Sequence, residues 1–214
     1  MRLILASASP RRAELLRCAG FTFEVIVADI DERVKPGEAP EPYVRRLASN
    51  KSRAALAQLA AGTSQSTTSD VIVLGSDTAV VVDGLILGKP RDDSDARMML
   101  ERLSGRWHDV LTGVSLRTDG DEVAVVETTR VEFARLTADD MQAYVDSGEG
   151  RDKAGAYAIQ GLASRFIPRI DGSYANVVGL PVTTVGRLMA ELESRLASRR
   201  ESSYSGRDSS RKPL

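Results

Sequence analysis

Short apolar runs alternate with segments of helical periodicity in the first half of the chain. Residues 3–6, 21–27 and 71–75 are apolar runs of strand length, which is typical of strands buried in a sheet. Residues 11–19 and 42–60 repeat apolar positions at helical spacing and predict two amphipathic helices. This half of the chain therefore predicts strands and helices in alternation, as in α/β proteins.

The second half predicts longer strands among its helices. We expect helices over residues 92–103, 137–147 and 181–198, and strands over residues 110–116, 123–133 and 166–170. Consecutive strands without a helix between them are antiparallel, so the sheet cannot be wholly parallel. The predicted fold class is α/β, with a mixed central sheet flanked by helices.

The domain organisation follows from two polar stretches. Residues 61–70 are rich in Ser and Thr and predict a surface loop. Residues 199–214 contain mainly Ser, Arg and Gly and predict a disordered tail. Residues 1–198 are therefore expected to form a single domain.

Composition and charge limit what the protein can bind. A chain of 214 residues that is 42% hydrophobic can build one sizeable core, or two lobes that share a sheet. Lys and Arg total 29 and Asp and Glu total 30, for a net charge of −1, so no overall positive field exists to hold a nucleic acid. Any anion site must be local, and we expect no nucleic-acid partner. No apolar run approaches the length of a membrane span, so we expect no membrane association either.

Cysteine and histidine, the two residue types most often found in disulfides and zinc sites, each occur only once. A single cysteine, Cys18, excludes a disulfide within the chain, and a single histidine, His108, excludes a zinc site built on several Cys and His ligands. Cys18 is predicted to be a core residue and His108 a structural one. The N-terminal apolar stretch is short and is followed by Arg11 and Arg12, the wrong order for a signal peptide. A cytoplasmic location fits these features, and a homodimer is left open.

Two arginines occupy an unusual place at the start of the first helix. Ser9 suits the N-cap and Pro10 the first helical position, so Arg11 and Arg12 fall in the first turn. Positive charge at that end opposes the helix dipole. A bound anion would reverse the sign, because free backbone N–H groups, the Ser7 and Ser9 hydroxyls and two guanidiniums would converge on it. The alternative is that both arginines point into solvent.

A lysine and an aspartate extend the candidate site. Lys51 lies on the apolar stripe of the second helix, where an ammonium must be paired or must reach out along its aliphatic stem. Asp77 and Thr78 follow the apolar strand at residues 71–75, at an end where α/β sheets gather ligands.

A predicted hairpin brings a second lysine close to Asp77. The turn at residues 83–84 would pair Val82 with Leu85, which places Thr78 opposite Lys89 and Asp77 opposite Pro90. Strict alternation would direct Asp77 and Lys89 to opposite faces, so a bulge or a strand end is required there. The alternative is a turn residue and a solvated edge charge.

Two further polar residues could contact a ligand. Glu32, in a polar loop with Asp29 and Asp31, could supply a carboxylate to a hard cation such as Mg²⁺, which takes few protein carboxylates when phosphates and waters complete its shell. Gln160, in a segment of small residues, could offer its amide to a base edge. Each has a simpler alternative, a charged surface turn and a turn cap. No P-loop or Gly-x-Gly-x-x-Gly signature is present.

Nine ordered motifs resemble the Maf family of nucleoside triphosphate pyrophosphatases. They are LASASPRR at 5–12, DE at 31–32, LA and K at 47–51, SDT at 76–78, ILGKP at 86–90, LSG at 103–105, TGV at 112–114, KAGAYAIQG at 153–161 and NVVGLP at 176–181. They span nearly everything from residue 3 to about residue 188. Ser76 departs from the more usual alanine, and the tail beyond residue 198 extends past the family pattern.

The resemblance implies a fold and a reaction. The fold would be elongated and two-lobed with a central cleft, related to the inosine-triphosphate pyrophosphatases. The reaction would be cleavage between the α and β phosphates to give a monophosphate and pyrophosphate. Asp77 matches the family's proposed proton acceptor, and Arg12, Thr78 and Gln160 match positions linked to base selection. That combination resembles the branch that acts on dTTP and UTP.

The mechanistic hypothesis combines these residues. One or more Mg²⁺ or Mn²⁺ ions held by Glu32 and Asp77 would bridge the triphosphate, while Asp77 activates a water. Positive charge would come from the two arginines, Lys51 and Lys89, and the Ser7 and Ser9 hydroxyls would help hold the phosphates. The competing readings are a non-catalytic nucleotide-sensing regulator of cell division, a phosphatase that releases the γ-phosphate, and a nucleic-acid-binding regulator.

Overall fold

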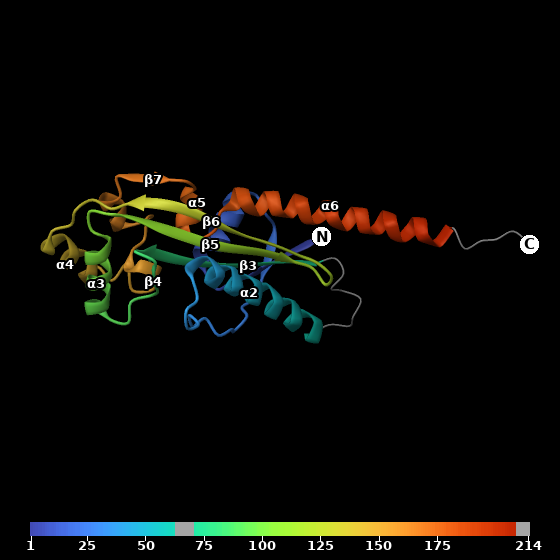
Figure 1. The fold of residues 1–214 in the computed structure, drawn as a ribbon, viewed down its shortest axis with the longest axis horizontal. Helices are drawn as coiled ribbons and strands as arrows, with labels where there is room; N and C mark the ends of the chain where they lie inside the picture. Colours follow the sequence, from blue (N-terminus) through green and yellow to red (C-terminus); the bar gives the residue numbers. More distant parts are fainter. Residues whose placement is uncertain (63–70, 209–214) are drawn as a thin grey trace, which may run out of the picture.

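A seven-stranded mixed sheet forms the centre of the molecule, with helices on both faces and the long C-terminal helix extending beyond it (Figure 1). This arrangement is seen in a computed structural model that describes residues 1–62 and 71–208. The elements in chain order are β1 (Arg2–Ala6), α1 (Pro10–Cys18), β2 (Phe23–Val25), α2 (Pro40–Gly62), β3 (Val71–Val82), β4 (Leu85–Leu87), α3 (Asp93–Leu103), β5 (Trp107–Arg117), β6 (Glu122–Glu132), α4 (Ala138–Asp146), the 3₁₀ helices η2 (Ala154–Ala156) and η3 (Leu162–Phe166), β7 (Arg169–Asp171), α5 (Tyr174–Val178) and α6 (Val182–Asp208).

The strand order is β2-β1-β3-β5-β6-β7, with β4 paired to β3. The pairs β1–β2 and β1–β3 are parallel, and β3–β4, β3–β5, β5–β6 and β6–β7 are antiparallel. The predicted mixed central sheet flanked by helices is therefore confirmed. Parallel pairing is confined to the first βα units, where helices connect the strands.

Strand β3 is the centre of the sheet and carries the candidate residues. One of its edges is paired with β5 from Val73 to Val81. On its other edge β1 pairs with residues 71–75 and β4 pairs with residues 80–82. Within the described residues, Ser76–Ala79 therefore have no strand partner on that edge. We call this stretch the open edge of β3.

Helix α2 packs very closely over β3 and β5, because two glycines lie beneath it. A Cβ at Gly75 would lie 2.1 Å from the Ala48 carbonyl oxygen, and one at Gly113 would lie 2.2 Å from the Val44 carbonyl oxygen. The helix backbone thus rests directly on the sheet. This contact fixes the position of the α2 side chains relative to the open edge.

Two large apolar clusters lie under different sets of helices, and these helices, α3 and α4 in one set and α6 in the other, lie toward opposite ends of the sheet (Figure 1). One is built from α3, α4 and the adjoining ends of β3, β5 and β6, around Leu100, Phe133 and Phe166. The other lies under α1 and α6, around Leu16, Leu74 and Leu192. The long strands β3 and β5 pass through both clusters, so the two ends are joined by the sheet itself.

Several predicted elements differ from the observed ones. Strand β3 continues seven residues past its predicted end, because β5 pairs with it beyond Gly75. The strand predicted over residues 166–170 is instead β7 at Arg169–Asp171, preceded by the 3₁₀ helix η3. Pro168 has no backbone N–H, so pairing begins only after it.

Two further predictions need correction at the surface and at the end of the chain. Cys18 is exposed rather than in the core, since the buried face of α1 is formed by Arg12, Ala13 and Leu16 and Cys18 lies on the opposite side. Helix α6 does not end near Ser198 but runs to Asp208, because no proline interrupts it. Of the predicted loop at 61–70 and tail at 199–214, residues 63–70 and 209–214 lie outside the described residues. No helix within residues 1–62 and 71–208 combines the length and hydropathy of a membrane span.

Candidate functional site

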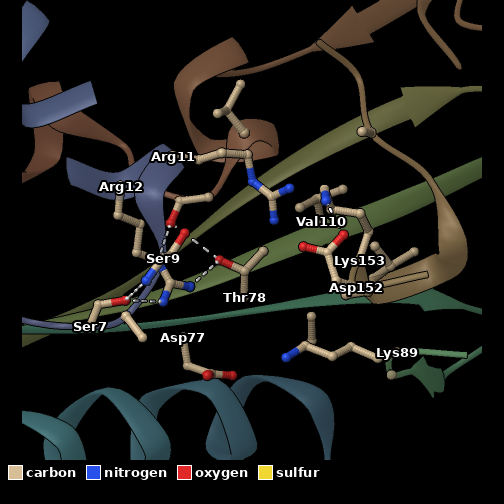
Figure 2. A pocket seen from close by; sticks show the side chains of 18 of the residues that line it. Ser7, Ser9, Arg11, Arg12, Asp77, Thr78, Lys89, Val110, Asp152 and Lys153 are labelled. Atoms are coloured by element: carbon tan, nitrogen blue, oxygen red, sulfur yellow. Dashed lines mark hydrogen bonds and ion pairs between the residues drawn. The ribbon is translucent and has the colours of Figure 1, made fainter. Parts of the chain in front are cut away.

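A cavity of about 700 Å³ opens over the open edge of β3, where β1 and β4 diverge. Its walls are the turn between β1 and α1, the loop before α2, the end of β4, residues 152–160 and the end of α5. All ten residues that the sequence singled out for catalysis, substrate binding or metal binding line it, as described below. Figure 2 shows the labelled side chains converging from several elements.

The turn between β1 and α1 is held together by Arg12. Its side chain is 9% exposed and donates through Nε to the Gly179 carbonyl oxygen at 2.9 Å, through NH1 to Ser7 Oγ at 3.2 Å and through NH2 to Thr78 Oγ1 at 3.1 Å. Ser7 Oγ also accepts from the Ser9 backbone N–H at 3.2 Å. Arg12 therefore links three distant segments of the chain, and two of its five N–H donors remain beyond these bonds.

Arg12 is a buried cation whose direct partners are all neutral. Burial lowers the pKa of Arg12 below its ordinary value, Asp77 and Glu32 oppose this through their charge, and Arg11 adds to it. Arg11 is half-buried and its guanidinium extends into the middle of the cavity (Figure 2). Ser9 is the N-cap residue of α1 but its side chain makes no capping bond, so its hydroxyl is available to a ligand. Both arginines thus line the cavity instead of pointing into solvent, and anion binding at this helix start stays a prediction.

Lys51 lies between two carboxylates. Its Nζ is 2.6 Å from Asp77 Oδ1 and 2.6 Å from Glu32 Oε1, and its side chain is 11% exposed. The lysine predicted to lie on the inward face of α2 is thus inward and paired, as an ammonium in that position requires. Burial alone would raise the pKa of Glu32, but the hydrogen bond from Lys51 and the charges of Lys51, Lys89 and Arg12 hold it below its ordinary value.

Asp77 keeps one oxygen for other partners. Lys51 bonds Oδ1, and within the described residues no group donates to Oδ2. Asp77 itself lies in the middle of β3, opposite Gly113 of β5, rather than at a strand end. Its side chain nevertheless lines the cavity, which opens beside the unpaired edge of β3.

Lys89 reaches the site because strand β4 ends before it. The hairpin pairs Val82 with Leu85 as predicted, but β4 ends at Leu87. The predicted pairing of Thr78 with Lys89 and of Asp77 with Pro90 is therefore wrong. Since Lys89 has left the ladder, its side chain is free of the alternation and extends toward Asp77 (Figure 2).

The opposite wall comes from residues 152–160. Gln160 is exposed at the cavity, and its amide makes no hydrogen bond within the described residues. Asp152 and Lys153 form an ion pair beside Arg11 (Figure 2). The sequence analysis did not select these two residues. The signal that could have found them is their place at the start of the same small-residue segment.

The cavity is more positive than the protein as a whole. Its charged lining residues are Arg11, Arg12, Lys51, Lys89, Lys153, Glu32, Asp77 and Asp152. Five cations thus face three carboxylates in a chain whose net charge is −1. A local site of this sign favours an anionic ligand with several charges.

The carboxylate oxygens at the site are also the groups that could bind a divalent cation. Nowhere in residues 1–62 and 71–208 do three or more His, Cys, Asp or Glu residues gather in a way that could hold a metal ion. Glu32 Oε1 and Asp77 Oδ1, however, each lie 2.6 Å from Lys51 Nζ, so these oxygens are at most twice that distance apart. Asp31 is turned away, in an exposed pair with Arg33. Two carboxylates match the few protein ligands that Mg²⁺ takes beside substrate phosphates.

His108 lies outside this site and has a structural role. It is 3% exposed, its Nε2 is 2.8 Å from the Tyr157 hydroxyl, and its ring packs against Phe133. Burial lowers the pKa of His108 to about 4. The structural interpretation of this histidine fits its environment.

Fold and site together define a mixed α/β protein with a cation-lined cleft at the middle of its sheet. A sequence profile of the family described as Maf-like protein matches residues 2–192. The chain belongs to this family.

Two proteins of similar sequence share a name. A protein of Hahella chejuensis named dTTP/UTP pyrophosphatase is 50% identical over 191 residues, which cover 89% of this chain and 92% of that protein. A protein of Vibrio cholerae with the same name is 47% identical over 188 residues, covering 88% and 96%. Among solved structures, the Staphylococcus aureus Ham1 protein aligns with a TM-score of 0.40 and 18% identity, over 63% of this chain and 72% of that one.

Proposed function

We propose that this protein hydrolyses nucleoside triphosphates, dTTP and UTP among them, to the monophosphate and pyrophosphate. The observation that carries the proposal is Asp77, a carboxylate with a free oxygen in a cavity lined by five cations. Relatives of about half-identical sequence over nearly the whole chain are named dTTP/UTP pyrophosphatase. A cytoplasmic location, which the single cysteine favours, is part of the proposal.

The cations bind the triphosphate and stabilise the departing pyrophosphate. Arg11 and Lys89 reach into the cavity (Figure 2), and Lys51 lines it beside Asp77. Positioned cations of this kind neutralise charge that develops on the leaving group. The Ser7 and Ser9 hydroxyls and the amides at the start of α1 add hydrogen bonds to the phosphates.

Asp77 acts as the proton acceptor. Its Oδ2 orients a water and takes its proton as the water attacks the α-phosphorus. Lys51 holds the carboxylate through Oδ1, so the accepting oxygen keeps one direction. The bond between the α-phosphorus and the bridging oxygen breaks, and the charge leaves with pyrophosphate.

Glu32 and Asp77 would hold a divalent cation, Mg²⁺ or Mn²⁺. Both carboxylates face Lys51 Nζ at 2.6 Å, and this pair of oxygen ligands is the set that would hold such an ion beside the substrate. When bound, such an ion supplies Lewis-acid stabilisation of the charge on the phosphates. When no ion is bound, Lys51 supplies positive charge to the same two carboxylates.

Gln160, Thr78 and Arg12 select the base. The Gln160 amide offers one acceptor and two donor hydrogens, which can match the edge of a base. Arg12 bonds Thr78 and Gly179, and this fixes the opposite side of the cavity.

A substrate panel tests the proposal. Nucleoside triphosphates are incubated with the protein and Mg²⁺ or Mn²⁺, and pyrophosphate and orthophosphate are scored separately. We expect UTP and dTTP to give the monophosphate and pyrophosphate. Orthophosphate with the diphosphate would instead indicate cleavage at the γ-phosphate, and binding without turnover would favour a nucleotide-sensing regulator.

A further inference from the structure

We propose that Tyr144 and Glu149 act together as a clamp that positions the turn carrying Gln160, and through it the base of the substrate. The inference rests on the proposed function, since it assigns the clamp to the base-binding part of that site. Neither residue lines the cavity. They are therefore positioning residues, which act through Gln160.

The clamp binds the backbone on both sides of Gln160. The Ala158 N–H donates to the Tyr144 hydroxyl oxygen at 3.1 Å. The Leu162 N–H donates to Glu149 Oε2 at 2.8 Å, and the Ala163 N–H donates to Oε1 at 3.3 Å. Gln160 thus lies in the middle of a six-residue stretch that is anchored at both ends.

The two clamp residues are also bonded to each other. The Tyr144 hydroxyl donates to Glu149 Oε1 at 2.7 Å. Burial, followed by this bond, raises the pKa of Tyr144, so the hydroxyl keeps its proton and the direction of donation is fixed. The chain of bonds from the Ala158 N–H through Tyr144 to Glu149 makes the two anchors one unit.

The absence of a side chain at Gly161 leaves room for the Glu149 carboxylate. A Cβ at this position would lie 2.0 Å from Glu149 Oε2, so the carboxylate occupies the space that any other residue would need. The turn itself is closed by a bond from the Gly161 N–H to the Ala158 carbonyl oxygen at 3.1 Å. The glycine beside Gln160 is thus explained by the approach of Glu149.

The Gln160 side chain has little support of its own. Gln160 and Ile159 line the main cavity on one side and a second cavity of about 440 Å³ on the other. Ile159 and Ala163 pack into the core cluster, but the exposed Gln160 side chain between these cavities is not held by packing. Its position therefore depends on the bonds from Tyr144 and Glu149.

Glu149→Gln tests the clamp. The amide has one acceptor oxygen, so its nitrogen must face one of the donors that the carboxylate served. We expect the KM for UTP to rise about 10-fold while kcat changes less than about threefold, as when a positioned hydrogen bond to the base is lost. The dissociation constant of inorganic tripolyphosphate, which has no base, should stay within about twofold of the wild-type value, because phosphate binding is untouched.

A double variant shows whether the effect passes through Gln160. With Gln160 already replaced by Ala, adding Glu149→Gln should raise the KM for UTP no further. Multiplying effects, or an equal loss of tripolyphosphate affinity in Glu149→Gln, would overturn the proposal. Tyr144→Phe keeps the ring packing and should reproduce the Glu149→Gln result, and Glu193→Gln on the exposed face of α6 is the control.

A direct readout separates this inference from the proposed function. Amide hydrogen exchange of Leu162 and Ala163 in the free protein should be slow in the wild type and faster in Glu149→Gln, at unchanged melting temperature. Equal exchange in both proteins would refute the clamp. Failure of the proposed function would appear in the wild type itself, as UTP that yields no pyrophosphate, and would leave the exchange result intact.

Discussion

Lys51 is paired with two carboxylates from separate segments, Glu32 and Asp77. Of these two, Asp77 is the proposed general base, and its replacement tests that role directly. Asp77→Asn keeps the size of the side chain but removes the proton acceptor. We expect kcat for UTP to fall about 10²-fold or more, as for removal of a positioned general base. Pyrophosphate release under saturating substrate is the measurement.

The matched control is Asp139→Asn, an exposed aspartate on α4 that lies outside the cavity. It should retain wild-type turnover. If Asp77→Asn also turned UTP over at close to the wild-type rate, the assignment of the base would be rejected.

His108 is expected to make the folded protein less stable at acid pH. Its folded pKa is about 4, below the ordinary value of 6.5, so above pH 6.5 it is neutral in both states. Between pH 6.5 and about 4 the unfolded chain takes up a proton that the folded protein refuses, and stability falls as the pH falls. The expected loss from this residue is about 3 kcal/mol, reached near pH 4.

His108→Phe provides the comparison for this prediction. The variant is less stable at neutral pH because the Tyr157 hydroxyl loses its partner. The difference in unfolding free energy between the two proteins, from denaturant titrations, should shrink between pH 6.5 and 4. A difference that is constant with pH would contradict the buried neutral histidine.

Some candidate residues could be recognised from the sequence around them, whereas others depend on contacts between distant segments. Lys51 could be found because an ammonium on an apolar helical stripe must be paired, and its pairing is observed. The partners of Arg12 could not be found, since Gly179 is 167 positions away along the chain. The exposure of Cys18 was also missed, because the stripe of a nine-residue helix is too short to fix its buried face.

At the scale of elements, the sequence predicts the order of strands and helices but not the lengths that create the site. The strand predicted over residues 71–75 continues to Val82, because β5 pairs with β3 beyond residue 75. Gly75, the last residue of the predicted strand, serves the close approach of α2. The cavity depends on where β1 and β4 leave β3, which is decided by pairing between distant strands.

Gly75→Ala tests the contact between helix and sheet. The new Cβ would meet the Ala48 carbonyl oxygen and the Ser52 backbone nitrogen, at 2.1 and 2.7 Å, so α2 must move. Overpacking of this kind costs about 1–3 kcal/mol, and each kcal/mol lowers Tm by about 2–4 °C in a chain of this size. We expect kcat for UTP to fall as well, because Lys51 moves with α2 away from Asp77.

Gly186→Ala in α6 is the control, since a Cβ there meets nothing within 4 Å. It should leave activity unchanged and raise Tm slightly, as alanine favours a helix over glycine. Loss of stability without loss of activity in Gly75→Ala would mean that the α2 contact does not position Lys51.

At the scale of the whole molecule, the site joins two ends that have separate apolar clusters. The turn between β1 and α1 belongs to one end and residues 152–160 to the other, and both line the same cavity. The long strands connect the ends through backbone pairing (Figure 1). A ligand that bonds both walls adds a second connection.

A non-hydrolysable UTP analogue should therefore stabilise both ends at once. At 100 times its dissociation constant it adds about 2.7 kcal/mol to the unfolding free energy by mass action, which a thermal melt detects as a higher Tm. Amide hydrogen exchange should slow in residues 7–12 and in residues 152–160 together, because phosphates contact the first segment and the base contacts the second. Inorganic tripolyphosphate should protect residues 7–12 while leaving residues 158–160 close to the free protein. Protection confined to one wall by the full nucleotide would show that the two ends do not bind it as a single site.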